Sequence, residues 1–333
     1  MGSFARFGFG LAATLLVGCG GSASLSTEPP PAAMTATAQP SASASAMAWC
    51  PPHAARTLAE KLADPADLAT DDSGVYLVSY SGLERIRKPD ATHELLIASY
   101  GTSIAVDTDA VYCACNGLQR VDKRTQAVTT LNYDSTDRVV VDDSAIYLLA
   151  AYGGLVKAMD KHGANFRTLG ATALDSGFGL MASDEQALYV SQVATGPDSP
   201  VYRVDKHGGS KVIAMGGVLR GLTGTGDNVY FTDETAQQVS RVATAGGSVQ
   251  AFSTGGYPNA ITTDKQYIYW IREQLTADDT YVGDVLAQPI VGGEAQTLAS
   301  FTGYAAGIAV SSDCVYWITG GIGTGALLST AKP

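Results

Sequence analysis

Aspartates at regular spacing are the first candidates for chemistry in this 333-residue chain. Each lies five residues before a tyrosine that recurs about every 40 residues. Recurrence favours a turn role over a metal site, because an Asp side chain accepts hydrogen bonds from the N–H groups of its own turn. A calcium site inside one repeat stays an open alternative, although no Asp-x-Asp-x-Asp-Gly loop occurs. The residues are Asp71, Asp107, Asp142, Asp184 and Asp264.

The four histidines are the next candidates, since imidazole is the most frequent general base. His93, His162 and His207 each follow the third predicted strand of a repeat, and His53 has the equivalent place before the strand 56–59. We expect them near the outer edge of one face, in different repeats, too far apart to serve one site. No Gly-x-Ser-x-Gly motif occurs. We therefore expect no His-dependent catalysis, no metal site and no cofactor.

Tyrosines, arginines and acidic residues between the predicted strands are candidates for ligand binding. Loops on a rigid scaffold often carry function, and tyrosine offers amphipathic contact area at low entropic cost. The alternative is that these tyrosines only pack between repeats. The candidates are Arg220, Asp233, Glu234, Tyr257, Arg272, Glu273 and Tyr304. Further tyrosines expected on the same face are Tyr80, Tyr100, Tyr133, Tyr152 and Tyr281, the last near the tip of the longest loop, Arg272 to Asp284.

The elements that position these residues are predicted by an internal repeat. A hydrophobic-Tyr pair occurs seven times, at intervals of 35 to 47 residues with a mean of 40. Within each repeat, four short strands alternate with Gly- and Asp-rich turns, which is the pattern of a β-propeller blade. The sequence therefore predicts an all-β, seven-bladed β-propeller of four-stranded antiparallel blades. The tyrosines of the pairs are Tyr76, Tyr112, Tyr147, Tyr189, Tyr230, Tyr269 and Tyr316.

The last repeat is incomplete, and the start of the propeller region supplies its missing strand. The segment 56–59 matches 296–299, a fourth strand, while the seventh repeat has only three strands before Pro333. We expect the N-terminal strand to complete the last blade and close the ring, which removes exposed sheet edges.

One segment resembles the YWTD motif of lipoprotein-receptor-type propellers. It is Val229-Tyr230-Phe231-Thr232-Asp233, and looser matches begin at Ile268 and Val315. The resemblance implies a propeller over residues 56–330. Receptor YWTD propellers have six blades and this chain counts seven, so the resemblance implies the architecture and no particular ligand.

Two functions of different kinds are compatible with these residues. The first is a binding module that holds a protein, peptide or glycan on the loop face, without catalysis. The second is a metal-dependent propeller lyase or lactonase, in which Asp233, Glu234 and Glu273 converge near the axis and hold a divalent ion. Carboxylates within reach of one point would favour the enzyme. A purely structural envelope component is a third interpretation.

The cysteines indicate an oxidising compartment, because four are left after one is assigned to lipidation. Cys50 lies just before the closing strand and Cys314 begins the second strand of the same blade, so a Cys50–Cys314 disulfide is expected to lock the ring. Cys113 and Cys115 lie two apart on one predicted strand, with an expected Cα separation of roughly 6.5–7 Å, at the limit for a disulfide. Whether they are bonded, and whether they have a redox role, stays open.

The N-terminal residues predict export and a membrane anchor. Residues 1–18 form an apolar signal with one arginine, and Leu16-Val17-Gly18-Cys19 resembles the lipobox of bacterial lipoproteins, which implies lipidation of Cys19. Residues 19–49 are rich in Ala, Ser and Pro and predict a disordered tether, which leaves 50–333 for the propeller. Gly20 favours the outer membrane, since no Asp follows the cysteine. We expect a lipid-anchored monomer of the cell envelope.

Net charge excludes one class of partner. The formal charge is −11, and no basic stripe interrupts it. Such a chain repels phosphate backbones, so we expect no nucleic-acid partner.

Overall fold

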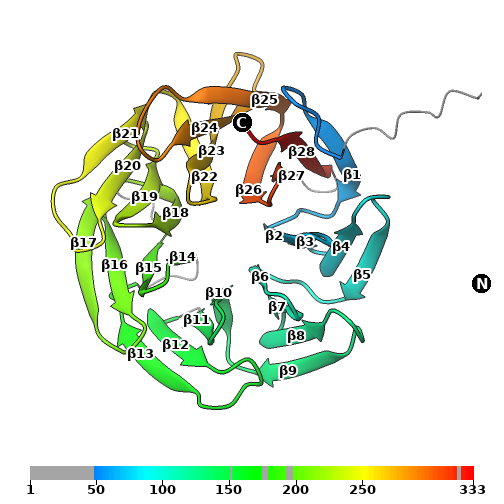
Figure 1. Cartoon of the computed structure of the whole chain (residues 1–333), viewed down its shortest axis with the longest axis vertical. Coiled ribbons are helices and arrows are strands. Elements are labelled where there is room, and N and C mark those ends of the chain that lie inside the picture. Colours follow the sequence, from blue (N-terminus) through cyan, green and yellow to red (C-terminus); the bar gives the residue numbers. More distant parts are fainter. Residues whose placement is uncertain (1–48, 151, 175–178, 193–197, 321–323) are drawn as a thin grey trace, which may run out of the picture. The chain divides into compact units, whose positions relative to one another are not determined.

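The computed structural model describes residues 49–150, 152–174, 179–192, 198–320 and 324–333. The expected signal peptide, the lipidation site Cys19 and the tether up to residue 48 lie outside these described residues. Within them, no helix has the length and apolar character that crossing a membrane requires. The described chain forms seven four-stranded antiparallel sheets, each a blade of a β-propeller (Figure 1). The fold class predicted from the repeat is confirmed.

Each blade places its strands in order from the axis of the ring to its edge (Figure 1). The innermost strands are β2 (Asp67–Asp71), β6 (Ile104–Val106), β10 (Thr136–Val141), β14 (Gly179–Ser183), β18 (Leu219–Thr225), β22 (Tyr257–Thr263) and β26 (Tyr304–Val310). The second strands are β3 (Gly74–Val78), β7 (Ala110–Ala114), β11 (Ile146–Ala150), β15 (Ala187–Gln192), β19 (Asn228–Asp233), β23 (Tyr267–Leu275) and β27 (Cys314–Gly320).

The outer half of each blade follows the same order. The third strands are β4 (Leu83–Arg87), β8 (Leu118–Asp122), β12 (Leu155–Met159), β16 (Ser199–Asp205), β20 (Gln238–Ala243), β24 (Tyr281–Pro289) and β28 (Gly325–Ala331). The outermost strands are β5 (His93–Ile97), β9 (Val128–Asn132), β13 (Arg167–Ala171), β17 (Ser210–Gly216), β21 (Gln250–Thr254), β25 (Gln296–Thr302) and β1 (Arg56–Leu62). We number the blades 1 to 7 from β2 onward, so blade 7 contains β26, β27, β28 and β1.

The strand order creates two different ends of the ring. The turns from first to second and from third to fourth strand form one end, called here the turn face. The connections from second to third strand and the links between blades form the other end, the loop face. The core lies between blades: the second-strand tyrosines of all seven repeats are no more than 2% exposed and pack in clusters shared with the neighbouring blade. The hydrophobic-Tyr repeat is therefore the core of the fold.

Ring closure occurs as the sequence predicts. β1 pairs with β28 in antiparallel register, with Arg56 opposite Ser329. Cys50 and Cys314 form a disulfide across 264 residues. Just before it, the Trp49 indole N–H donates to the Tyr316 hydroxyl at 2.8 Å, so the residues preceding β1 are held by blade 7 as well.

The second cysteine pair is also a disulfide, and the expected spacing was wrong. Cys115 lies just beyond the end of β7, where Asn116 and Gly117 take positive φ and turn the chain. The Cα atoms of Cys113 and Cys115 are therefore 5.2 Å apart, closer than in a continuous strand. Both residues are fully buried, and the link between blades 1 and 2 covers them at Gly101.

Candidate functional site

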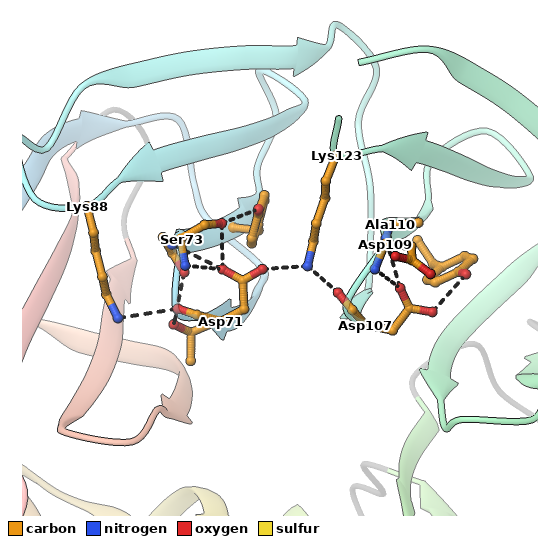
Figure 2. A network of polar contacts seen from close by, with 11 residues as sticks. Asp71, Ser73, Lys88, Asp107, Asp109, Ala110 and Lys123 are labelled. Atoms are coloured by element: carbon orange, nitrogen blue, oxygen red, sulfur yellow. Dashed lines mark hydrogen bonds and ion pairs between the residues drawn. The ribbon is translucent and has the colours of Figure 1, made fainter. Parts of the chain in front are cut away.

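The turn face is organised by the repeated aspartates, each of which accepts hydrogen bonds from N–H groups two and three residues later. Their interpretation as turn residues is confirmed. A lysine from the next blade adds a second contact: Lys123 of blade 2 lies 2.5 Å from Asp71 Oδ2 of blade 1 and also donates to the Asp107 carbonyl (Figure 2). The lysine thereby joins two blades.

This Asp–Lys contact recurs around the ring. Lys161 contacts Asp107 at 2.8 Å, Lys206 contacts Asp142 at 2.7 Å, and Lys332 contacts Asp264 at 2.5 Å. Partial burial by itself favours the neutral acid, but the lysine and turn bonds outweigh it and hold the pKa of Asp71, Asp107, Asp142 and Asp264 below the usual value. Each contact joins neighbouring blades. We call these four Asp–Lys contacts the ladder and assign it a structural role.

The loop face has a different composition. Of the sixteen tyrosines, seven form the buried repeat and two are partly buried. The other seven are all exposed, and all lie at the loop face: four in links or second-to-third-strand connections, and three as the first residue of β22, β24 or β26. The exposed tyrosines are Tyr80, Tyr100, Tyr133, Tyr152, Tyr257, Tyr281 and Tyr304. Because exposed aromatic rings do not stabilise a core, their gathering on one face indicates a contact surface.

Blades 5, 6 and 7 form a cleft of about 330 Å³ on this face. Three exposed tyrosines border it, and the rings of Tyr281 and Tyr304 meet edge to face at 5.7 Å. Five of the seven sequence candidates line it, namely Arg220, Glu234, Tyr257, Glu273 and Tyr304. The other lining residues are Pro258, Asn259, Gln274, Leu275 and Tyr281.

The floor of the cleft contains a buried carboxylate. Glu273 on β23 is 6% exposed, and its Oε1 accepts the Ala305 N–H of blade 7 at 2.6 Å. Its Oε2 accepts from Asn259 Nδ2 at 2.9 Å, and the same amide donates to the Ala305 carbonyl. Burial raises the pKa of Glu273, against the effect of these two bonds. Glu273 and Asn259 therefore hold blades 6 and 7 together beneath the tyrosines.

One charged pair lines the cleft, and a second lines an adjoining groove. Arg220 Nε lies 2.5 Å from Glu234 Oε2 of the same blade. Arg272 contacts Asp284 at 2.6 Å in an adjoining groove of about 790 Å³, which shares Tyr257 and Glu273 with the cleft. Both arginines thus carry their own counter-ion.

Arg272 lies in this position because Gly256 has no side chain. A Cβ on Gly256, whose φ is +74°, would lie 2.5 Å from the Arg272 side chain. The expected long loop 272–284 is mostly an extended hairpin instead: β23 and β24 continue their pairing to Leu275 opposite Tyr281. Only Thr276–Thr280 remain as a turn, closed by the Thr276 N–H to the Thr280 carbonyl. Equal lengthening of both strands keeps the main chain paired, which a free loop would not.

Asp233 is not among the residues that line the cleft. It is 5% exposed, and its carboxylate accepts the N–H groups of Gly217 and Ala236 at 2.8 and 2.9 Å. The YWTD-like segment 229–233 thus ends in a residue that fixes the neighbouring link and turn.

The carboxylates of the metal-dependent alternative are each engaged by protein donors: Asp233 and Glu273 by backbone N–H groups, and Glu234 by Arg220. The described residues contain no group of three or more His, Cys, Asp or Glu arranged to hold a metal ion.

The histidines lie in four different blades. His53 precedes β1 in blade 7, and His162 and His207 lie in turns of blades 3 and 4. His93 begins β5, and its Nε2 contacts the buried Glu84, whose other oxygen contacts the Ser79 hydroxyl. The Glu84 carboxylate lies between the Ser79 hydroxyl and the His93 imidazole. These three residues therefore do not form a serine nucleophile in contact with its histidine base.

Sequence reasoning missed Asn259 and the ladder lysines. Asn259 lies ten residues before Tyr269, just as Arg220 lies ten residues before Tyr230. Aligning the repeats would therefore have placed Asn259 at the position of the candidate Arg220. The lysines come one or two residues after the third strand of several repeats, and this recurrence was the available signal.

Comparison with known proteins supports the fold. No protein-family model and no curated protein matches the chain significantly. Among solved structures, hydrazine synthase of Kuenenia stuttgartiensis is 14% identical with a TM-score of 0.59, over 80% of this chain and 95% of that one. A chain of the mitotic checkpoint complex is 11% identical with a TM-score of 0.61, over 83% and 93%. BamB from Moraxella catarrhalis is 13% identical with a TM-score of 0.52, over 82% and 99%. At these identities the likeness extends to the fold alone.

Proposed function

We propose that this protein is a lipid-anchored binding module of the cell envelope that holds its ligand in the loop-face cleft between blades 5, 6 and 7. One observation carries the proposal: every exposed tyrosine lies on the loop face, and three of them border a cleft with polar side chains on its floor. Rigid aromatic rings around a cleft provide binding energy at little entropic cost.

The contacts of the acidic residues in and near the cleft favour binding over catalysis. The three acidic residues of the enzyme alternative hold backbone N–H groups or Arg220, and none contacts an imidazole. A general base or nucleophile needs a partner positioned to take or give its proton. The resident contacts instead make the cleft rigid, which suits recognition.

The binding proposal is tested with isolated cell envelopes and the full chain carrying Cys19→Ser, so that no acyl anchor contributes to sedimentation; this background is the wild type of the binding assays. Wild-type protein is mixed with envelopes, and the bound fraction is measured after sedimentation over a concentration series. The double variant Tyr257→Ala/Tyr304→Ala should lose at least tenfold in affinity. The control Tyr133→Ala/Tyr152→Ala removes two tyrosines that are even more exposed and lie on the loop face outside the cleft, and it should bind as wild type. Equal binding by all three proteins would refute the cleft as the site.

The anchor is tested separately. Cys19→Ser should move the protein from the membrane fraction to the soluble fraction, because a single acylated cysteine carries the proposed attachment. Ser22→Ala, three residues later, is the matched control. Retention of Cys19→Ser in the membrane fraction would contradict lipidation at this residue.

A further inference from the structure

The chemistry of the cleft lining identifies a class of ligand, an inference that rests on the proposed binding function. Its polar groups are side-chain carboxylates, amides and a guanidinium, so donors and acceptors alternate over short distances: Arg220 beside Glu234, and Asn259 beside Glu273. Gln274 adds an exposed amide at the same cleft. Ligand hydroxyl groups match such a surface, because each one both donates and accepts.

Charge excludes strongly ionic ligands. Arg220 is neutralised by Glu234 at 2.5 Å, and Arg272 in the adjoining groove by Asp284 at 2.6 Å. An anionic ligand would have to displace these carboxylates, and a cationic one would have to compete with both arginines. A ligand without net charge leaves both pairs intact and still finds oriented polar groups.

The aromatic rings require a ligand with flat apolar faces. Tyr257, Tyr281 and Tyr304 are between 41% and 48% exposed, and two of them meet edge to face. The three tyrosines line the same space as the polar pairs Arg220–Glu234 and Asn259–Glu273. A pyranose ring has a face of C–H groups surrounded by hydroxyls, so it can stack on a tyrosine while its hydroxyls reach the carboxylates.

A peptide fits the same surface less well. The main-chain groups of the hairpin β23–β24 pair with each other, with β25 and, up to Glu273, with β22, so only Gln274 and Leu275 extend beyond β22 and the cleft offers an edge of two residues. Strand addition needs a longer edge. A proline-rich peptide could lie on the tyrosines, but proline lacks the N–H donor that the acceptors of Glu234 and Glu273 require.

We infer that the ligand is an uncharged glycan, with a pyranose ring stacked on the tyrosines and hydroxyls bonded to Glu234 and Gln274. The shared chemistry allows two envelope sources, an insoluble wall polymer or the glycan of a lipid. Both are tested directly.

The experiment compares envelopes treated in three ways: untreated, oxidised with periodate, which cleaves vicinal diols, and digested with protease. Binding of the full chain, again with Cys19→Ser so that no acyl anchor contributes, should fall at least tenfold after periodate and stay unchanged after protease. Loss after protease with survival after periodate would overturn the glycan and leave the binding function in place. Failure to bind untreated envelopes would overturn the binding function itself, so the two failures are distinguishable.

A second measurement locates the contact and its source. Detergent-boiled wall polymer and vesicles of extracted envelope glycolipid are titrated separately with wild type, Tyr304→Ala, Glu234→Gln and Tyr133→Ala. On the source that binds, Tyr304→Ala should lose at least tenfold and Glu234→Gln several-fold, while Tyr133→Ala binds as wild type. Equal affinity for all four proteins, or no binding to either source, would refute the assignment.

Discussion

The turn face of blades 1 to 4 and the loop-face cleft of blades 5 to 7 use similar polar residues in opposite ways. On the turn face the same pair recurs: Lys206 meets Asp142 as Lys123 meets Asp71. In the cleft, equivalent places carry different residues, such as Arg220 in blade 5 and Asn259 in blade 6. In a repeat protein, polar residues that follow the repeat stabilise every blade alike, and residues that depart from it are candidates for recognition.

The ladder itself is interrupted on the turn face of blades 4, 5 and 7. Thr225 replaces the aspartate in blade 5, and in the described chain no lysine contacts the Asp184 carboxylate of blade 4. Blade 7 has Ser311 at this place, and Lys88 of blade 1 lies over the Tyr316 ring instead. These interruptions supply matched controls within one molecule.

The largest effect on the free energy of unfolding is expected at blade 7, which closes the ring and has Ser311 in place of the repeat aspartate. Cys50→Ser should lower the free energy of unfolding by about 4–5 kcal/mol, because the disulfide closes a loop of 264 residues. Removing Cys113–Cys115 as a pair of serines should cost less by this mechanism, since its loop is two residues. Denaturant unfolding under oxidising conditions measures both. A smaller loss for Cys50→Ser would show that β-sheet pairing alone secures the ring.

A smaller effect is expected in the ladder. Asp142→Asn should cost about 2 kcal/mol at neutral pH, because the nearly buried Lys206 loses its charged acceptor. The pKa of Asp142 is lower in the folded state than in the unfolded state. At pH values between these two pKa values, the unfolded state therefore binds more protons than the folded state. This contribution is complete above pH ~4 and is lost as the pH falls toward the lowered pKa.

The control for the ladder is Asp184→Asn. Asp184 has the same turn bonds and the same tyrosine contact, without a lysine on its carboxylate in the described residues. Asp184→Asn should lower the free energy of unfolding by less than Asp142→Asn does at pH 7. The difference between the two losses should narrow toward pH 2, as measured by urea unfolding. Equal costs would remove the lysine from the explanation.

The next effect separates buried from exposed tyrosines. Tyr147→Phe removes a hydroxyl that donates to Asp142 Oδ2 at 2.9 Å and should cost about 1 kcal/mol. Tyr152→Phe, on the loop face of the same blade, should leave the free energy of unfolding unchanged within about 0.5 kcal/mol. Similar losses for both would contradict the division of tyrosines into core and contact surface.

The smallest effect on stability is expected in the cleft. Tyr257→Ala/Tyr304→Ala should change the free energy of unfolding by less than about 1 kcal/mol, because both rings are exposed. Thermal unfolding checks this alongside the binding assay. A loss of several kcal/mol would mean that these rings pack between blades, as the alternative interpretation of the sequence holds.

Much of the fold could be predicted because its signals are local. The Tyr repeat, the Asp turns and the match between 56–59 and 296–299 are visible within short windows, and they predict blades, turns and closure. The extended hairpin was missed because strand pairing beyond Arg272 depends on register, which the composition of a loop does not show. The spacing of Cys113 and Cys115 was missed because the strand ends one residue earlier than expected.

The candidate site was only partly predictable. Arg220, Glu234 and Tyr304 were chosen from their residue types and their place between strands, and the ring brings all three to one cleft. Asp233 has the same chemistry and an adjacent position, yet its side chain turns to Gly217 N–H. Along a strand, successive side chains point to opposite sides, so neighbours in sequence need not share a site.

The sequence by itself determined the number of blades, the turn residues and the closing strand, because each depends on contacts within a repeat or on matching repeats. Tertiary structure alone decided which residues meet between blades. Lys206 reaches Asp142 across 64 residues, and Glu273 reaches Ala305 across 32, in each case in a neighbouring blade. Such contacts depend on the curvature of the ring and on side-chain direction. The recurrence of the lysines in the sequence does not by itself say which residue of the neighbouring blade each one meets.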